Sequence, residues 1–403
     1  MRMFMRLASA TVVLAIVAGC GTGAATPNLD APTTPPASGS TPSGSTPSGS
    51  AAATTQAASP ILPTIGKFTA TGTMTVPRTY DTATLLSDGR VLVVGGQDPN
   101  GATLASAEVF DPKTGTFAAA GSMKIARWGH AATLLKDGRV LITGGENEGG
   151  TPLDSSEIYD PATGKFSLSG KMSIARVNHT ATLLGDGRVL VAGGAGDAGN
   201  GVNSAELFDP ATGKFTATGS MASGRWGHTA SLLKDGRVLM VGGKDDSVFA
   251  SAEIYDPSTG TFAVTGSMET PRWGQAVALL SSGLVLVTGG EDDTGAALQT
   301  AELFDPAAAT FTGTGSMTAS RVGHAATTLA SGLVLIAGGI DSNGAGIATA
   351  ELFDPTDGTF TATGSLADAR GHHTQTLLAD GEVLIAGGTG GDQVLDQAEI
   401  YQP

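Results

Sequence analysis

The chain has 403 residues, of which 22 are basic and 37 are acidic, so its formal net charge is −15. An acidic chain without basic clusters is not expected to bind nucleic acid, nor to be drawn electrostatically to anionic lipid. Its single cysteine, Cys20, lies near the N-terminus, which predicts no disulfide and no thiol chemistry in the rest of the chain.

Residues 1–19 have the features of an export signal. Two arginines precede an apolar run, 7–18, that is too short to span a bilayer but suits the core of a signal peptide. The run ends in Val17-Ala18-Gly19-Cys20, which resembles the lipobox of bacterial lipoproteins. The resemblance implies cleavage before Cys20 and attachment of lipid to Cys20. We therefore expect a lipid-anchored protein of the cell envelope with an extracytoplasmic domain; an ordinary signal peptide with a chance cysteine is the alternative.

Residues 20–64 have a different composition from the rest of the chain. After Cys20 they are rich in Ser, Thr, Pro and Gly, carry only Asp30 as a charge, and contain almost no large apolar side chains. Such a segment buries too little surface to offset the entropy of ordering it. We expect a disordered linker, which the Ser and Thr content leaves open to O-glycosylation.

From residue 65 to 403 the sequence repeats a block of about 49 residues seven times, which is typical of β-propeller blades. Each copy has an arginine, a Gly-Gly pair whose second glycine lies 18 residues later, and a glutamate. The arginines are Arg78, Arg127, Arg176, Arg225, Arg272, Arg321 and Arg370. The glutamates are Glu108, Glu157, Glu206, Glu253, Glu302, Glu351 and Glu399.

The second copy predicts a four-stranded antiparallel meander. Short apolar runs at 130–135 and 139–143 flank Asp137-Gly138, a dipeptide favoured in two-residue hairpins. After a variable stretch, strands at 155–159 and 165–171 flank an Asp-Pro-Ala-Thr-Gly turn.

The Gly-Gly pair followed by two aromatic residues seven positions apart, such as Tyr159 and Phe166, resembles the kelch repeat. The family usually has Trp at the second aromatic position, where this chain has Phe. The first hairpin of each copy is similar to the bacterial, galactose-oxidase-like branch of kelch proteins. The resemblance covers about 66–403 and implies an all-β propeller.

The ends of the repeat region predict how the propeller closes. The last copy stops after its third strand, at Tyr401, and the missing fourth strand occurs at 66–72, which matches 213–219. We expect the N-terminal strand to complete the C-terminal blade, which gives seven blades and no open sheet edge.

The repeated arginines and glutamates favour a structural role, because charges at blade junctions need buried partners. The same reasoning applies to the histidine found three residues after the arginine in five copies; copy one has Asp81 there and copy five has Gln275. A catalytic residue or a metal ligand is normally present once, so we predict neither among these repeated positions.

One position after each arginine the sequence varies, and all three tryptophans, Trp128, Trp226 and Trp273, occur there. This position is expected near the mouth of the central channel, on the face that carries the variable loops. The loops are 97–105, 146–154, 195–203, 244–250, 291–299, 340–348 and 389–396. The candidate ligand-binding residues are Trp128, Trp226, Trp273, Tyr80, Asp81, Asn178 and His372. Inter-blade packing by the tryptophans is the alternative.

The loops are acidic, with Asp245-Asp246, Glu291-Asp292-Asp293, Asp341 and Asp392. No EF-hand loop is present, so we predict solvated acids and no cofactor, with calcium as the alternative.

These features favour a monomeric, non-enzymatic binding module that presents its variable face to a glycan or an exported protein. A scaffold without a small-molecule ligand is a second reading. A third is a carbohydrate-active enzyme, an isomerase, lyase or oxidase, that uses Tyr80, Asp81, His372 or Gln275. Copper-radical oxidase chemistry looks absent because residues 66–403 contain no cysteine for the Tyr–Cys crosslink that the resemblance would require.

Overall fold

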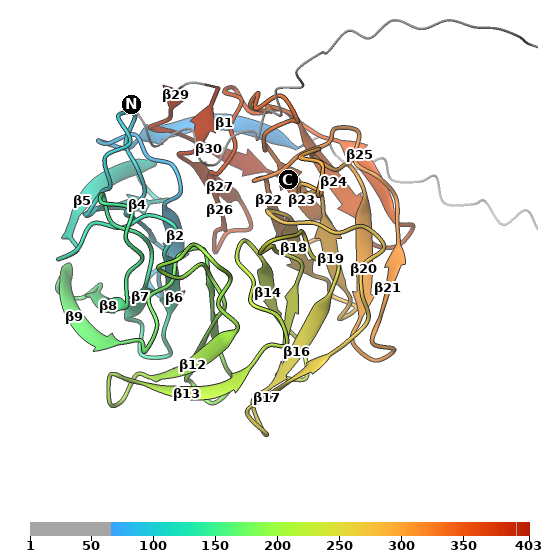
Figure 1. The fold of residues 1–403 in the computed structure, drawn as a ribbon. Coiled ribbons are helices and arrows are strands. Elements are labelled where there is room, and N and C mark those ends of the chain that lie inside the picture. Colours follow the sequence, from blue (N-terminus) through green and yellow to red (C-terminus); the bar gives the residue numbers. More distant parts are fainter. Residues whose placement is uncertain (1–65, 392) are drawn as a thin grey trace, which may run out of the picture. The chain divides into compact units, whose positions relative to one another are not determined.

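The computed structural model describes residues 66–391 and 393–403, which form strands and their connections. Seven four-stranded antiparallel sheets and one two-stranded hairpin account for all the strands described. The sheets stand as seven blades around a common axis (Figure 1). The predicted seven-bladed, all-β propeller is confirmed. Residues 1–65, with the expected signal peptide, Cys20 and the linker, lie outside the described residues.

Blades 1 to 6 each use four consecutive strands. Blades 1 and 2 contain β2 (Thr82–Leu85), β3 (Val91–Val94), β4 (Ser106–Asp111), β5 (Thr116–Ser122), β6 (Ala131–Leu134), β7 (Val140–Thr143), β8 (Ser155–Asp160) and β9 (Lys165–Lys171). Blades 3 and 4 contain β10 (Thr180–Leu183), β11 (Val189–Ala192), β12 (Ser204–Asp209), β13 (Lys214–Ser220), β14 (Thr229–Leu232), β15 (Val238–Val241), β16 (Ala252–Asp256) and β17 (Thr261–Val264). Blades 5 and 6 contain β18 (Ala276–Leu279), β19 (Val285–Thr288), β20 (Ala301–Asp305), β21 (Thr310–Gly313), β22 (Ala325–Thr328), β23 (Val334–Ala337), β24 (Ala350–Asp354) and β25 (Thr359–Ala362).

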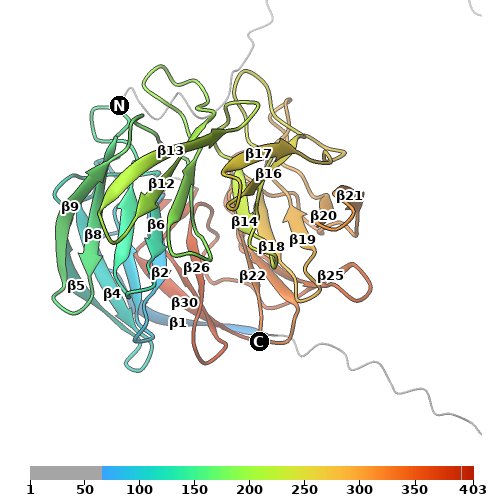
Figure 2. The ribbon, with the colours of Figure 1, turned by 90° about the horizontal axis from the view of Figure 1, so that it is seen from below.

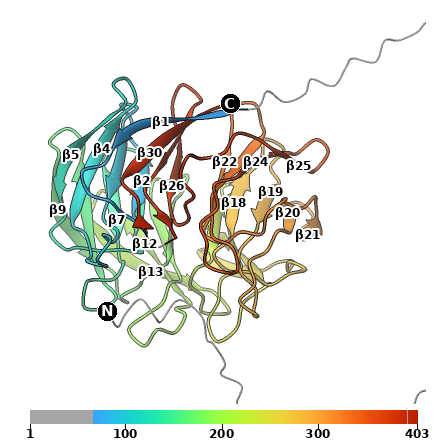
Figure 3. The same cartoon turned by 90° about the horizontal axis from the view of Figure 1, so that it is seen from above.

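Blade 7 joins the two ends of the described chain. Its strands are β26 (Thr374–Leu377), β27 (Val383–Ala386), β30 (Gln397–Gln402) and β1 (Lys67–Thr73), and the hairpin β28 (Thr389–Gly390) and β29 (Gln393–Val394) lies in its loop. β1 pairs with β30 in antiparallel register, with Lys67 opposite Gln402. Figure 3 shows β1 in blue beside β30 in red. The predicted closure by the N-terminal strand is confirmed.

The core lies between blades rather than within one sheet. The second strand of every blade is completely buried, because it packs against a neighbouring blade on each face. Seven apolar clusters fill the seven junctions, each with residues from two adjacent blades. Figure 2 shows the fourth strands, such as β9, at the periphery of the propeller.

The turn of the first hairpin differs from the expected two-residue type. In blade 2 the N–H of Leu135 donates to the carbonyl of Arg139, and the N–H of Gly138 donates to that of Leu135. Three residues, 136–138, therefore form the loop. Only Gly138 has a positive φ, of 86°, whereas a two-residue type I′ turn would need a positive φ at both positions. The prediction was wrong because Asp137 stays in the ordinary region.

Among the described residues, no helix is long and apolar enough to cross a membrane.

Candidate functional site

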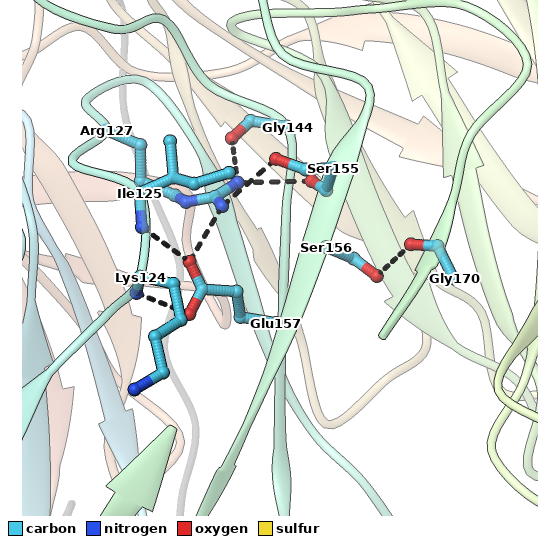
Figure 4. Close-up of polar contacts among 8 residues, drawn as sticks. All are labelled: Lys124, Ile125, Arg127, Gly144, Ser155, Ser156, Glu157 and Gly170. Atoms are coloured by element: carbon cyan, nitrogen blue, oxygen red, sulfur yellow. Dashed lines mark hydrogen bonds and ion pairs between the residues drawn. The ribbon is translucent and has the colours of Figure 1, made fainter. Parts of the chain in front are cut away.

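The repeated arginines and glutamates form a buried pair at every blade junction. In blade 2 the Arg127 guanidinium donates to the carbonyls of Gly144 (2.6 Å) and Ser155 (3.1 Å) and to Glu157 Oε1 (3.1 Å) (Figure 4). The other arginines pair with their glutamates at 2.8 to 3.1 Å. Glu157 also accepts the N–H groups of Lys124 (2.7 Å) and Ile125 (3.1 Å). The terminal nitrogens of these arginines are thus engaged with glutamate and backbone oxygens, whereas the buried Nε of all but Arg370 has no protein partner.

A second polar contact, made three residues after the arginine, joins five of the seven junctions. A His or Gln nitrogen lies 2.8 to 3.2 Å from a threonine hydroxyl of the preceding blade. The pairs are Thr82–His130, Thr143–His179, Thr180–His228, Thr229–Gln275 and Thr288–His324. Burial lowers the pKa of His130 and His228 to about 3, so these imidazoles are uncharged at neutral pH.

The two junctions of blade 7, which we name the seam, lack this contact among the described residues. The His373 ring packs against Gly338 of blade 6, whose inner strands offer Ala325 and Ala337 where other blades have threonine. Both nitrogens of His373 have no protein partner. At the other junction Asp81 replaces the histidine, and both its buried carboxylate oxygens have no protein partner. Burial raises the pKa of Asp81 to about 7, although Arg78 opposes this shift.

Two residues after each arginine the backbone forms a closed circle around the axis. We call these seven positions the ring residues: Tyr80, Gly129, Asn178, Gly227, Gly274, Gly323 and His372. Each donates its N–H to the carbonyl of the ring residue in the preceding blade, at 2.8 to 3.4 Å. The circle therefore connects all seven blades through main-chain hydrogen bonds.

Every ring residue has a left-handed backbone, with φ between 51° and 63°. Glycine adopts this conformation freely, whereas other residues lose about 1–2 kcal/mol there and asparagine tolerates it best. Tyr80 and His372 are therefore strained by the requirement of the circle. Such outliers persist where the surroundings hold them and often mark functional sites.

Tyr80 and His372 stack on each other beside Trp128, and we name these three residues the axis cluster. The Tyr80 and His372 ring centroids lie 4.4 Å apart at 29°, and those of Tyr80 and Trp128 lie 5.5 Å apart at 59°. Trp128 is 8% exposed, whereas the other two are half-buried. Burial raises the pKa of Tyr80 to about 12 and lowers that of His372 to about 4, so both rings are uncharged at neutral pH.

The other two tryptophans belong to blades 4 and 5 and enclose an ammonium group. Lys244 Nζ lies 4.7 Å from the Trp226 ring centroid and 3.7 Å from that of Trp273. Trp273 donates its indole N–H to Glu291 (3.2 Å). Burial lowers the pKa of Lys244, and the nearby Glu291 charge opposes this shift. We call Trp226, Lys244, Trp273 and Glu291 the lysine cluster.

The loops of blades 3 to 6 are joined to one another by side-chain hydrogen bonds. Asp245 accepts the N–H of Gly201 in the preceding loop (2.7 Å), and Asp293 accepts that of Val248 (2.7 Å). The Ser342 hydroxyl accepts the N–H of Ala297 (2.9 Å). Some of the acids predicted to be solvated thus hold neighbouring loops in place.

Charge is unevenly divided between the two faces of the propeller. The loop face comprises the connections from second to third strands and from fourth strands to the next blade; the turn face is opposite. Apart from the buried pairs and Asp81, the described loop face has fourteen acids and three lysines. They are Asp98, Glu146, Glu148, Asp154, Asp197, Asp245, Asp246, Glu269, Glu291, Asp292, Asp293, Asp341, Asp368 and Asp396, with Lys124, Lys171 and Lys244.

The turn face is nearly balanced. It carries thirteen acids and ten basic residues, and four of its arginines pair with an aspartate two positions earlier, as Arg90 does with Asp88. The negative field of the propeller therefore emanates mainly from the loop face.

No group of three or more His, Cys, Asp or Glu side chains is arranged to hold a metal ion within 66–391 and 393–403. Several loop acids instead accept backbone N–H groups of their own loop, as Asp98, Asp292 and Asp341 do. Asp392, named among the acidic loop residues, lies outside the described residues.

The structure brings together only some of the candidate residues. Tyr80, Trp128 and His372 form the axis cluster, and Asp81 lies next to Tyr80 in the seam. Trp226 and Trp273 lie in the lysine cluster, and Asn178 is one of the ring residues of the backbone circle. Gln275 donates to Thr229 and to the Val241 carbonyl.

The sequence analysis missed Glu146 and Lys244 and named Glu291 only among the loop acids. Each follows a Gly-Gly pair directly and lies opposite a tryptophan in a β-bridge. A signal was present, because this position is charged only in the three copies that have tryptophan; it is Gln, Ala, Ile or Thr in the other four.

Comparisons with known proteins agree with this architecture. The family model described as the KLHDC2/KLHL20/DRC7 Kelch-repeats domain matches residues 81–290. No curated protein matches the chain in sequence. Among solved structures, a fungal alcohol oxidase of the AA5 family in complex with copper is similar, with a TM-score of 0.69 and 20% identity. The match covers 84% of this chain and 76% of the oxidase, and at that identity it shows a shared fold alone.

Proposed function

The chain belongs to the KLHDC2/KLHL20/DRC7 Kelch-repeats domain family, and on that premise we propose that its propeller is a binding module whose loop face docks a basic protein. Kelch domains generally bind proteins. The observation that carries the proposal is the charge division between the faces, with fourteen acids against three lysines on the loop face. A face of one sign attracts partners of the other sign and accelerates their encounter.

The arrangement of the loops supports the same role. Those of blades 3 to 6 are fixed by the hydrogen bonds of Asp245, Asp293 and Ser342 to their neighbours. A surface already ordered before binding loses less conformational entropy when a partner docks. The loop face thus combines a net charge with a largely preformed shape.

An envelope location is part of the proposal. Residues 1–19 would serve as the export signal, with Cys20 as the site of lipid attachment and 21–64 as the spacer. Gly66, the first residue described, donates its N–H to the Thr363 hydroxyl and accepts the N–H of Gly364, both of which follow the fourth strand of blade 6. A Cys20→Ala variant is expected to move from the membrane fraction to the soluble fraction; unchanged membrane association would contradict the anchor.

The experiment selects random displayed peptides on the purified chain at low salt. We expect enrichment of Lys- and Arg-rich peptides whose binding weakens as salt rises. Replacing two loop-face acids, as in a Glu148→Gln, Asp246→Asn variant, should weaken binding about threefold to tenfold. The matched turn-face variant, Asp357→Asn with Asp380→Asn, removes the same charge and should change it less than twofold.

Selected peptides without positive charge, or equal losses in the two variants, would overturn the basic-partner proposal. Glycans screened in the same format test the other ligand class. Binding of a neutral glycan, together with no enriched peptide, would replace the protein partner by a carbohydrate.

A carbohydrate-active enzyme is the second candidate function. It is favoured by the unrepeated Tyr80 and His372, whose rings stack beside the axis with no protein hydrogen bond to their polar atoms among the described contacts. Turnover with aldoses, sialates and alcohols, lost in Tyr80→Phe and His372→Gln variants, would support it. A chain that binds peptides but turns over none of these substrates is expected under the first proposal.

A further inference from the structure

We propose that the axis cluster, together with Glu146, binds a primary ammonium group of the partner, supplied by a lysine side chain or by a chain N-terminus. This inference rests on the proposed function, because it names the chemical group through which a basic partner would engage the loop face. The axis cluster lies on blades 7, 1 and 2, apart from the loops joined by hydrogen bonds on blades 3 to 6.

The lysine cluster shows how this scaffold holds an ammonium group. Lys244 Nζ lies over two tryptophan rings, at 4.7 Å from Trp226 and 3.7 Å from Trp273, with Glu291 nearby. Aromatic faces attract cations through the negative potential above the ring. A carboxylate beside them neutralises the charge that burial would otherwise penalise. In this protein, two aromatic rings and one carboxylate thus surround an ammonium group.

The same elements recur two blades away from this cluster, at blades 1 and 2. Glu146 lies opposite Trp128 in a β-bridge, just as Glu291 lies opposite Trp273. Tyr80 supplies the second aromatic ring, 5.5 Å from Trp128. The two clusters differ in two places. Blade 1 has Gln97 where blade 4 has Lys244, and its aromatic ring comes from Tyr80 because Thr79 occupies the position of Trp226. Among the described residues, no lysine or arginine lies over the Tyr80 or Trp128 ring.

The acidic and donor groups of this site are unpaired within the described residues. Glu146 takes part in no ion pair, is half-buried, and has its pKa raised by burial. The Trp128 indole N–H is buried without a protein partner, in contrast to that of Trp273, which donates to Glu291. A half-buried carboxylate beside the partly buried Tyr80 ring is suited to a cation that arrives from outside.

The backbone strain of the ring supports a role beyond packing. Four ring residues are glycine, which satisfies the circle at no conformational cost, and one is Asn178. Tyr80 and His372 occupy the same conformation with bulky side chains, and their rings stack at a centroid distance of 4.4 Å. His372 thereby fixes the orientation of Tyr80, which is what a preformed aromatic wall for a cation requires.

The experiment titrates the purified full chain with short peptides, followed by saturation-transfer NMR and tryptophan fluorescence. The first peptide is N-terminally acetylated and contains a single lysine among Gly and Ser; in the second, acetyl-lysine replaces that lysine. A third has a free N-terminus and no lysine. We expect the first or the third to bind and the second not to bind; which of the two binds identifies the source of the ammonium group.

Variants then locate the site. Glu146→Gln should weaken binding about tenfold, whereas Glu148→Gln, which removes an exposed charge from the same loop, should change it less than twofold. Tyr80→Gly makes the ring position match that of four other blades and should abolish peptide binding, while relief of the backbone strain partly offsets the lost ring contacts. Gln97→Lys introduces the counterpart of Lys244 and should fill the site from within, which also abolishes binding. Asn178→Gly is the matched ring variant that should leave binding unchanged.

Equal affinity for the lysine and acetyl-lysine peptides, or equal effects of Glu146→Gln and Glu148→Gln, would overturn the inference. Failure of the ammonium site is distinguishable from failure of the proposed function. If basic partners bind the loop face and lose affinity in the Glu148→Gln, Asp246→Asn variant but not in Glu146→Gln, then the docking surface stands and the ammonium site does not.

Discussion

Blade 7 and the other six blades share one plan but differ in how their inner strands meet. Every blade has the buried Arg–Glu pair, so each junction is equally supplied with charge contacts. The His–Thr or Gln–Thr contact, in contrast, joins blades 1 to 6 in sequence and is missing on both sides of blade 7. The comparison teaches that the Arg–Glu pair is repeated in every blade, while the inner-strand contact is lost where the two ends of the described chain meet.

The largest expected effect tests the part that is shared. Glu157→Ala in blade 2 and Glu399→Ala in blade 7 each leave a buried arginine without its counter-ion. Removing one partner of a buried pair costs about 3–5 kcal/mol. Urea unfolding monitored by circular dichroism should show losses of this size for both variants. A loss confined to one of the two blades would break the claim that the pair contributes equally everywhere.

The next effect sharpens the difference at the seam. Asp81 has a pKa of about 7 in the folded state and an ordinary value of 3.8, so the folded state holds its proton more tightly. Stability from this group is therefore complete below about pH 4 and is lost as pH rises through 7. Asp81→Asn should remove this dependence and stabilise the protein above pH 7 by up to about 4 kcal/mol.

Melting temperatures of Asp81→Asn and the unmodified chain, measured from pH 4 to pH 8, check that expectation. The difference in melting temperature between the variant and the unmodified chain should increase as pH rises. Asp88→Asn on the exposed turn face serves as the control, and no widening with Asp81→Asn would contradict the assigned burial of a charged carboxylate.

The smallest effect transfers the missing contact from one junction to another. Ala337→Thr places a hydroxyl in blade 6 where Thr143 and Thr288 lie in blades 2 and 5, so His373 gains a partner. A hydrogen bond of this kind contributes about 1 kcal/mol. Thr143→Ala should lower the free energy of unfolding by about the same amount, because it leaves His179 without its hydroxyl partner, as His373 is in the unmodified chain. Chemical unfolding should show that Ala337→Thr raises the free energy of unfolding and that Thr143→Ala lowers it. Changes of the same sign would mean that packing, rather than the hydrogen bond, determines the stability of these junctions.

Much of the fold was predictable because repetition makes each position visible seven times. The count of blades followed from the arginines, and the closure followed from the match of 66–72 with 213–219. The strand boundaries in blade 2 agree to within one or two residues. The turn at Asp137-Gly138 was missed because the dipeptide fits two hairpin types, and only the backbone conformation of Asp137 separates them.

The candidate site was predictable only in part. Composition located the three tryptophans at one blade position, but it did not separate the buried Trp128 from the half-buried Trp226 and Trp273, because their exposure depends on residues of neighbouring blades. The left-handed ring could not be inferred either. Tyr80 and His372 occupy positions that are glycine elsewhere, and a sequence pattern with four glycines in seven reads as variation rather than as a conformational requirement.

The pairing of β1 with β30 also sets an order of events for the newly made chain. Lys67 is made before its partner Gln402, so β1 must wait until β30 has been made before it has a neighbour. The circle of ring residues likewise cannot close before His372 has been made, because its last link joins Tyr80 to His372. A chain that stops short of β30 keeps two unpaired sheet edges, which favour aggregation and proteolysis. Closure of blade 7 thus requires that synthesis has passed β30.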